Sequence, residues 1–491
     1  MSTHSAPSAL DLNYGVDDVP KPFGRALGLS LQHVLTMFGG TIAVPLILSP
    51  ALGFDAGQTA ILISSAFIAS GIATAIQLTI GSRLPIVQGV SFAFLGAFFA
   101  IIGNHQGAEA MQYIAGGIIL GGLVEVLVGY TGLIGTLQRF ITPITIGPVI
   151  ALIGLSLAGA AVGNVVTQVD PDGNVVAQGN WWMALLVIVL VFVFSLILAQ
   201  RNRFFALFPI LMAVVVAYLV ALGLSVTGLI DETNRAFVSF AGAGDTPWVR
   251  NVVGEQGLLL PWGAPRFDFG FFIVILAAYM ASAIESVGDY NAVSRIAGLG
   301  TPDDRTVSRG IGAEGVGCIG TALVGGFAST SYSENIGLIG LSKVASRYVV
   351  LLGAALLVGL GFVTKIGALI ATIPEPIVGG IYMALFGLIA GVGLSNLQRA
   401  DMDSQRNLLI AGFILFMGLA VPNYFSQIPG DWTLFGIDWL ADIVSSVGSS
   451  GIAVAAVLGL FLDNVIPGTA EERGIVDPER VDTEGTLPPH A

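Results

Sequence analysis

The chain has 491 residues, of which 54% are hydrophobic and only 10% are charged, and its formal net charge is −13. Because a soluble domain carries about 25% charged residues, this composition excludes a soluble globular protein and predicts a polytopic membrane protein. The one cysteine, Cys318, excludes a disulfide framework and a cysteine-rich metal site. No basic segment followed by an apolar core opens the chain, so we expect no cleaved signal peptide.

Apolar stretches long enough to cross a bilayer recur along almost the whole chain. Together with a broken segment at 327–343 they make about fourteen membrane elements, so we expect an all-α polytopic membrane protein. The apolar stretches are 25–48, 57–80, 87–103, 113–135, 142–163, 181–200, 205–227, 269–290, 309–324, 344–364, 375–395, 406–422 and 446–465.

The third and tenth elements begin with residues that are polar and prone to extended structure. The third opens with 88–94, and the tenth with 327–333, which is rich in Ser, Thr and Tyr. From Glu334 onward apolar residues return near helical spacing, with Ser333 as the expected N-cap. We expect a short strand and then a half-helix in both elements. Membranes tolerate such a break only where protein or a water-filled cavity satisfies the backbone, and it is typical of transporter binding sites.

The two broken elements are seven elements apart. Since seven is odd, a second copy of a seven-span unit enters the membrane upside down. Interrupted segments at matching positions of two halves are the best sequence indication of an inverted-repeat transporter. The spacing of the breaks therefore predicts a 7+7 inverted repeat.

Basic residues predict the orientation of the chain. With the N-terminus inside, all but four of the 19 Lys and Arg residues lie in loops on the inner side. The exceptions are Arg235, Arg250, Arg266 and Lys365, three of which share the long loop 228–268. We expect a multi-pass protein of the cell membrane with both termini in the cytoplasm.

Few ionisable residues lie within the apolar stretches, and each costs ~2.5 kcal/mol or more at the bilayer centre, so function is their default interpretation. Glu285 and Asp289 are four residues apart and share one helical face. A structural role stays open for Glu125, as a hydrogen-bonding group, and for His33, as an interhelical histidine. The complete set is His33, Glu125, Glu285, Asp289, Glu314 and Glu334, with Asp463 near the inner end of the last span.

These residues stand in segments that resemble the nucleobase–ascorbate transporter family, also called nucleobase:cation symporter-2, of the xanthine/uracil permease type. The resemblance runs from about residue 25 to residue 465. Its motifs are QHVLTMFGGTIAVP at 32–45, QGVSFAF at 88–94, AIESVGDYNAVSR at 283–295, RGIGAEG at 309–315 and TSYSENIGLIGLSKVASR at 330–347.

The resemblance implies a core domain that holds the substrate and a gate domain against which the core moves. Spans 1–4 and 8–11 would form the core, and spans 5–7 and 12–14 the gate. The expected boundaries are a polar tail at 1–24, core segments at 25–135 and 269–366, gate segments at 136–268 and 367–466, and an acidic disordered tail at 467–491.

The resemblance also places the substrate between the third and tenth elements. Glu285 and Glu334 would accept hydrogen bonds from ring N–H groups, and backbone amides near Phe92 and Ser333 would meet exocyclic oxygens. The chemistry of a planar oxo-pyrimidine or oxo-purine agrees, because its edge presents N–H donors and C=O acceptors.

Aromatic residues would cover the faces of the substrate ring. By resemblance, Tyr332 and Phe386 flank the ring, whose π faces suit such contacts. Asn335 would orient the neighbouring acids. No catalytic residue and no metal ligand is expected.

The coupling residues are expected to be Asp289, His33 and Glu314. This chain mixes two patterns of the family: ESVGDY resembles xanthine and urate carriers, whereas Glu334 resembles uracil carriers. The uracil type has a histidine at the position of Asp289, so Asp289 is expected to pair with His33 here. Both the base and the coupling ion, H⁺ or Na⁺, stay open.

We therefore predict a secondary-active nucleobase importer driven by cation symport, with elevator-like alternating access and no enzymatic activity. The alternative is an anion carrier or exchanger of the same 7+7 architecture, such as a sulfate or bicarbonate carrier. Such a pocket would place a positive charge beside the helix dipoles, whereas the central residues here are acids. The expected partners are a small nucleobase, membrane lipid and a second copy of the chain, with no nucleic acid and no cofactor besides the coupling ion.

Overall fold

The computed structural model describes residues 12–133, 140, 142–170, 173–252, 256–428, 432, 434 and 438–475. These residues are mainly helical, and nine of the described helices are long and apolar enough to cross a membrane. Shorter apolar helices lie at Phe92–Ile102, Arg347–Phe362 and Gly451–Val465. A multi-pass helical membrane protein is therefore confirmed, while the count of fourteen elements and the inverted repeat stay predictions.

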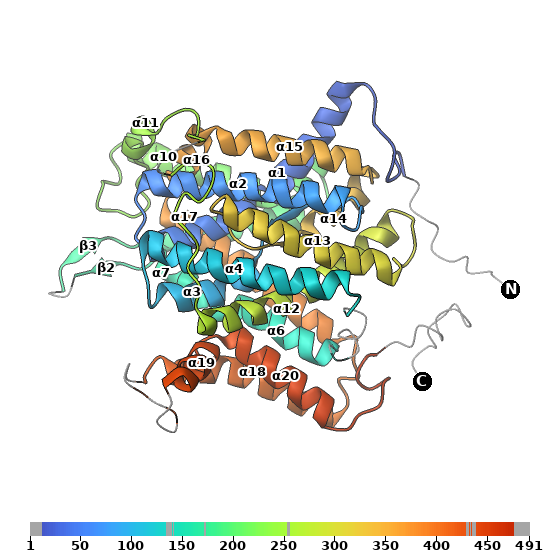
Figure 1. The fold of residues 1–491 in the computed structure, drawn as a ribbon. Coiled ribbons are helices and arrows are strands. Elements are labelled where there is room, and N and C mark those ends of the chain that lie inside the picture. Colours follow the sequence, from blue (N-terminus) through green and yellow to red (C-terminus); the bar gives the residue numbers. More distant parts are fainter. Residues whose placement is uncertain are drawn as a thin grey trace.

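The helices run largely parallel or antiparallel to one another in one thick bundle (Figure 1). In the first half of the chain they are α1 (Phe23–Leu52), α2 (Ala56–Thr79), η1 (Phe92–Phe94), α3 (Leu95–Ile102), α4 (Gly107–Tyr130), α6 (Pro143–Ser156), α7 (Ala158–Gly163), α8 (Trp181–Phe192), η2 (Val193–Leu198), α9 (Arg203–Leu207), α10 (Pro209–Val226) and α11 (Ala241–Asp245). In the second half they are α12 (Phe269–Ile296), α13 (Asp304–Leu323), α14 (Ser333–Ser342), α15 (Arg347–Phe362), α16 (Thr364–Ala371), α17 (Glu375–Leu397), α18 (Gln405–Phe425), α19 (Asp438–Gly448) and α20 (Gly451–Val465).

Local side chains explain where several of these helices begin. Asp55 forms a capping box with Gln58 at the start of α2, which satisfies two backbone groups that a helix end leaves free. Asp268 caps α12 and Asp303 caps α13 with the side chain alone, each accepting a hydrogen bond from a backbone N–H three residues later. Short polar residues in the loops thus define the ends of apolar helices.

The helices pack in two groups. In one group α13 packs on α4 and α2, and α2 also packs on α15 and α16; in the other, α17 packs on α6 and α8, and α18 on α6 and α20. Glycines allow the closest approaches: a Cβ on Gly129 of α4 would lie 2.2 Å from the backbone N of Gly312 in α13. The groups meet where α12 contacts α6, α19 and α20, and where α1 contacts α10 and α17.

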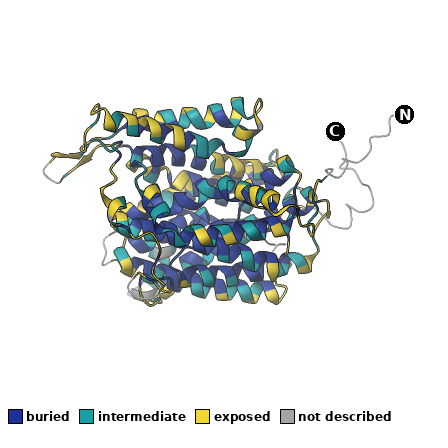
Figure 2. Cartoon of the chain, turned by 90° about the horizontal axis from the view of Figure 1, so that it is seen from above, coloured by how far each residue is buried: buried dark blue, intermediate teal, exposed yellow. Residues whose placement is uncertain are grey.

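Burial follows this packing. Buried residues fill the middle of the bundle, and exposed ones gather on its outer surface (Figure 2). Many exposed residues are large and apolar, including Leu185, Leu219, Phe416 and Phe461. An apolar outer surface of this extent is expected where lipid is the solvent.

Four short strands form two small antiparallel pairs. Strand β1 (Gln88–Val90) pairs with β4 (Ser329–Ser331), and β2 (Gln168–Val169) pairs with β3 (Val175–Ala177). The first pair lies inside the bundle, whereas the hairpin of β2 and β3 projects from one end of it (Figure 1). The short strands predicted in the third and tenth elements are therefore confirmed.

The first and last described segments lie at the end of the bundle opposite to the β2–β3 hairpin (Figure 1). Near the N-terminus, Tyr14 forms a β-bridge with Val344, and Asp17 forms an ion pair with Arg347 at the start of α15. Residues 1–11 of the expected polar tail lie outside the described residues.

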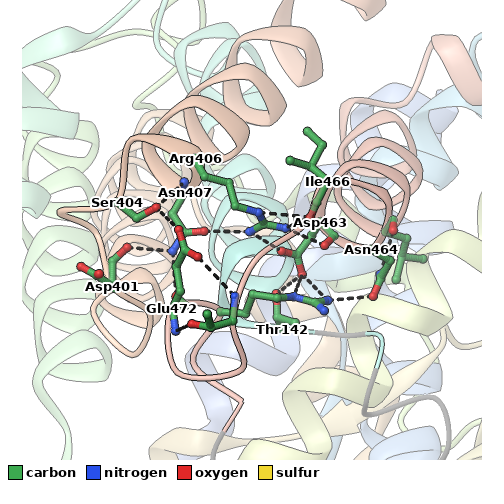
Figure 3. A network of polar contacts seen from close by, with 12 residues as sticks. Thr142, Asp401, Ser404, Arg406, Asn407, Asp463, Asn464, Ile466 and Glu472 are labelled. Atoms are coloured by element: carbon green, nitrogen blue, oxygen red, sulfur yellow. Dashed lines mark hydrogen bonds and ion pairs between the residues drawn. The ribbon is translucent and has the colours of Figure 1, made fainter.

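The expectation of a disordered tail from residue 467 is wrong for 467–475. This segment forms a turn that closes on α18 and α20 (Figure 3). Arg473 and Arg406 both form 3.0 Å ion pairs with the fully buried Asp463 of α20, and Thr142 donates a hydrogen bond to the same carboxylate. A buried carboxylate needs paired charges and donors, and Arg473 of the tail supplies one of them. Residues 476–491 lie outside the described part of the chain.

Candidate functional site

The β1–β4 pair forms the centre of the candidate site. Val90 pairs with Ser329, and Gln88 pairs with Ser331, so each strand ends beside the beginning of the other. Helix η1 and α3 follow β1, and α14 follows β4. Because the strands are antiparallel, two helix N-termini with their free N–H groups are brought to the middle of the bundle.

Tyr332 packs against β1. A Cβ on Gly89 would lie 2.4 Å from Tyr332 Cζ, and one on Gly40 of α1 would lie 3.2 Å from Cε2 of the same ring. The Tyr332 hydroxyl donates a 3.0 Å hydrogen bond to the carbonyl oxygen of Val90. Only glycine at position 89 leaves room for this ring. The ring thus lies between β1 and α1, where it closes one wall of the site.

Asp289 connects α12 to the broken element. Its Oδ2 accepts a 2.6 Å hydrogen bond from Ser331 Oγ of β4, and its Oδ1 accepts a 2.8 Å bond from Ser333 Oγ of α14. Ser286, one turn earlier on α12, lies 3.2 Å from Ser331 Oγ and 3.1 Å from Thr330 Oγ1. The expected role of Ser333 as the N-cap of α14 is wrong. Its hydroxyl donates to Asp289, and Tyr332 occupies the N-cap position without a side-chain cap.

The two acids expected to bind substrate lie beside this connection. Glu285 is half-buried on α12, and Glu334 is exposed in the first turn of α14. Neither carboxylate forms an ion pair with any described residue. A Cβ on Gly288 of α12 or on Gly337 of α14 would have no other atom within 4 Å. Both carboxylates therefore lack ion-pair partners among the described residues and are available as hydrogen-bond acceptors.

His33 and Asn335 form a separate pair. Asn335 Nδ2 lies 3.2 Å from His33 Nδ1 and donates a 3.0 Å hydrogen bond to the His33 carbonyl oxygen. The expected pairing of Asp289 with His33 is therefore wrong, because Asp289 faces the serines of β4 and α14. The expected role of Asn335 as the group that orients the acids is also wrong, because its side-chain N–H group donates to His33 of α1.

Two phenylalanines meet at the border of the helix groups. Phe92 of η1 and Phe386 of α17 have ring centroids 6.1 Å apart and ring planes at 83°. Phe386 also stacks on Tyr382, whose hydroxyl donates a hydrogen bond to the Ala43 carbonyl of α1. Phe92, at the start of η1, therefore forms one aromatic cluster with Phe386 and Tyr382 of α17.

Glu314 lies behind the site in a polar network that connects three helices. Its Oε2 accepts a 2.9 Å hydrogen bond from the Tyr290 hydroxyl, and its Oε1 accepts a 3.1 Å bond from Ser282. Gln77 of α2 donates a 2.8 Å bond to the Tyr290 hydroxyl. Both oxygens of Glu125 in the neighbouring α4 are buried without any hydrogen-bond partner in the described structure. The open interpretation of Glu125 as a structural hydrogen-bonding group therefore finds no partner among the described residues.

Sequence reasoning missed Ser286, Ser331, Gln77 and Tyr290. One of them carried a usable signal: Ser286 lies three residues before Asp289, on the same helical face of α12, and Tyr290 follows Ser286 by four residues on that face. Gln77 carried none, since it is one polar residue in an apolar span. Among the described residues no group of three His, Cys, Asp or Glu side chains could hold a metal ion.

A family model described as the Permease family matches residues 24–427. Curated relatives match over nearly the same length. Solute carrier family 23 member 2 of Mus musculus is 37% identical, with 96% of this chain and 76% of the relative covered. The chain belongs to the nucleobase–ascorbate transporter family.

Other members support this assignment. Solute carrier family 23 member 1 of Rattus norvegicus is 36% identical, with 96% of this chain and 83% of the relative covered. Nucleobase-ascorbate transporter 2 of Arabidopsis thaliana is 32% identical, with 94% and 90% covered. Because these relatives are transporters, the prediction of a membrane transporter that is not an enzyme is confirmed.

Solved structures share the fold at low identity. The transmembrane domain of a cyanobacterium bicarbonate transporter, BicA, aligns with a TM-score of 0.56 at 14% identity, covering 89% of this chain and all of that one. The murine Solute Carrier 26 family member A9 anion transporter in the inward-facing state aligns with a TM-score of 0.59 at 10% identity, covering 91% and 69%. At such identities these structures show the fold alone.

Proposed function

We propose that this member of the family carries a nucleobase, either uracil or a purine such as xanthine, by symport with a cation. The observation that supports this most is that Glu285 and Glu334, near two helix N-termini, form no ion pair with any residue that the structure describes. A planar nucleobase edge alternates N–H donors with C=O acceptors. The acids would accept the N–H groups, while free amides near Phe92 and Ser333 would donate to the oxygens.

The ring of the base would lie against the aromatic cluster of Phe92, Phe386 and Tyr382. Phe92 and Phe386 meet edge to face, and a planar substrate between the half-helix starts would contact their rings. Tyr332 shapes the pocket from the other side, since its hydroxyl is bound to Val90. We therefore assign Tyr332 the role of positioning β1, and not the role of flanking the substrate ring that the resemblance implied.

An anionic substrate is the second candidate. The name of the Arabidopsis thaliana relative joins nucleobase with ascorbate, which is an anion at neutral pH, and both structural neighbours are named as anion or bicarbonate transporters. An anion between Glu285 and Glu334 would be repelled unless a cation or proton accompanied it. The described residues that form the site include no Lys or Arg, so a neutral base is the better fit.

Asp289 is the proposed coupling group, with H⁺ as the ion and Na⁺ as the alternative. It is the acid that binds both β4 and the first residue of α14. A change in its charge would alter the attachment of the half-helix to α12. Glu314 of α13 is proposed to assist Asp289 in coupling, because Ser282 and Tyr290 of α12 donate hydrogen bonds to it.

Alternating access is proposed to arise from movement of one helix group against the other. Phe92 follows β1, which packs on α2 of the first group, and Phe386 lies on α17 of the second, so their contact would change during the movement. We further propose a plasma-membrane location, cytoplasmic termini and a homodimer, in line with the basic residues and the apolar outer surface.

Transport assays with the full chain in proteoliposomes test this function. Uptake of radiolabelled uracil, xanthine, ascorbate and sulfate would be measured with and without Na⁺ at two pH values. We expect saturable uptake of one base that is stimulated by an inward proton gradient. Uptake of sulfate or ascorbate alone would contradict the proposal and favour the anion carrier.

A further inference from the structure

Arg250 is a buried cation without an acidic partner. It lies between α11 and α12, is 3% exposed and forms no ion pair with any described residue. Nη1 donates a 2.9 Å hydrogen bond to Ser65 Oγ and Nη2 a 3.1 Å bond to the Gly257 carbonyl oxygen, whereas Nε has no partner. Burial lowers the pKa of Arg250 to about 10, so the guanidinium stays charged at neutral pH.

Another loop arginine, Arg235, is buried to a similar extent but has an acidic partner. The Arg235 side chain is 5% exposed and forms an ion pair with Glu375. Lys365, close to Arg250, donates to the carbonyl oxygens of Ala243 and Gly244 and lies over the ring of Trp248, 5.9 Å from its centroid. A buried charge is expensive unless an opposite charge or hydrogen bonds compensate it. This end of the bundle thus holds two cations whose described partners are all neutral.

A cavity of about 460 Å³ lies directly beside Arg250. Its wall includes the amide side chains of Asn251 and Gln256, which are hydrogen-bond donors. Thr364 also lines the cavity; it is 2% exposed, and its hydroxyl has no hydrogen-bond partner. Among the described residues, the cavity therefore combines a positive charge that has no ion-pair partner with neutral donors.

The N-terminus of α2 completes the wall. Ala56 and Gly57 line the cavity in the first turn, where backbone N–H groups have no partner within the helix and the helix dipole is positive. Asp55 is the one acid among the described lining residues, and it accepts a 2.8 Å hydrogen bond from the Gln58 N–H. Repulsion from Asp55 would keep a bound anion on the side of Arg250.

We propose that this cavity is a binding site for a compact anion, a halide or a small oxyanion. The anion would balance Arg250 and accept a hydrogen bond from Thr364, and it would thereby connect the loop before α12 to the start of α16. The site lies among the loops at the hairpin end of the bundle, and its lining includes neither Glu285 nor Glu334. The proposal does not depend on the nature of the transported substrate.

Anion titrations of the purified full-length protein test the proposal. Thermal unfolding would be followed in a low-salt zwitterionic buffer while chloride, bromide, phosphate or sulfate is added as the Tris salt. An anion that binds only the folded state should raise the Tm by about 2–4 °C at saturation. Arg266→Gln is the matched control, because Arg266 is another arginine before α12 but is exposed and paired with Glu109.

The variants separate a bound anion from a general effect of salt. Arg250→Gln should lose the anion-dependent rise in Tm, Arg250→Lys should keep at least half of it, and Arg266→Gln should match the wild type. Anomalous bromide density beside Arg250 in crystals of the wild type would supply the position. If Arg250→Gln does not fold, Thr364→Val should still weaken the anion response about threefold or more. A wild type whose Tm is indifferent to every anion, or responds equally in Arg250→Gln, would overturn the proposal.

Discussion

Ser331 donates a 2.6 Å hydrogen bond to Oδ2 of Asp289, across a sequence separation of 42 residues. Ser333 donates to the other oxygen of the same carboxylate. One acid of α12 therefore binds both the strand and the half-helix of the tenth element. This connection replaces the pair with His33 that the sequence favoured, and it makes Asp289 sensitive to any movement of α14.

Asp289→Asn should separate substrate binding from coupling. The amide keeps the size of the side chain but cannot gain or lose a proton, and only its oxygen can accept from the two serines. We expect equilibrium binding of the base within a few fold of wild type and no accumulation against a gradient. Calorimetric binding and proteoliposome uptake would be compared, with Glu285→Gln as the variant that loses binding itself. Accumulation by Asp289→Asn in response to a pH gradient would show that another group carries the proton.

Glu334→Gln should weaken the base without unfolding the protein. The carboxamide is nearly isosteric at this exposed first turn, but it replaces a charged acceptor with a neutral one. That difference is worth roughly 1 kcal/mol, or about fivefold in Kd. Glu109→Gln is the control, since Glu109 pairs with Arg266 in a loop. Unchanged Kd values for uracil and xanthine in Glu334→Gln would show that this acid does not contact the substrate.

Gly89→Ala should disrupt the site through Tyr332. The added Cβ would lie 2.4 Å from the ring, so either β1 or Tyr332 must shift. We expect at least about a tenfold loss of affinity, because the strand that positions η1 would move. Gly340→Ala on α14 is the matched control, since its Cβ would meet nothing within 4 Å. Wild-type affinity in Gly89→Ala would mean that the position of the ring is unimportant; partial rescue by a second change, Tyr332→Leu, would support the mechanism.

Arg473→Gln should destabilise the chain by detaching the C-terminal turn. Asp463 is fully buried and would keep only Arg406 and Thr142 as partners (Figure 3). Removing one partner of a buried ion pair costs about 3–5 kcal/mol, and the remaining pair with Arg406 should reduce this to about 1–3 kcal/mol. Thermal unfolding of Arg473→Gln would be compared with that of Arg399→Gln, an exposed arginine nearby. Equal Tm values for the two variants would mean that the turn contributes no stability.

Cysteine labelling tests the orientation predicted from the basic residues. Val175→Cys lies in the exposed β2–β3 hairpin, and Gln200→Cys lies after η2 at an exposed position. In intact cells an impermeant thiol reagent should modify Val175→Cys and spare Gln200→Cys. The native Cys318 is buried, so it provides an unreactive background. The opposite labelling pattern would refute the cytoplasmic placement of the termini.

The sequence alone determined the class of the protein, the approximate bounds of its helices and the two broken elements. It could do so because these features depend on local properties. Low charge predicts lipid as the solvent, and a row of Ser, Thr and Tyr predicts a break in a helix. The motifs around Glu285 and Glu334 also sufficed to indicate the family that the relatives confirm.

Only the tertiary structure decided which partner each polar group has. Helical periodicity places Asp289 and Glu285 on one face of α12 but does not say whether β4 or α1 lies opposite, so the pairings of His33 and Asn335 were predicted wrongly. The packed turn at 467–475 was missed because its acidic composition is that of a disordered segment. Its order comes from Arg473 reaching Asp463, ten residues earlier in the chain and buried between helices. Such contacts depend on how the whole bundle closes, which no local pattern records.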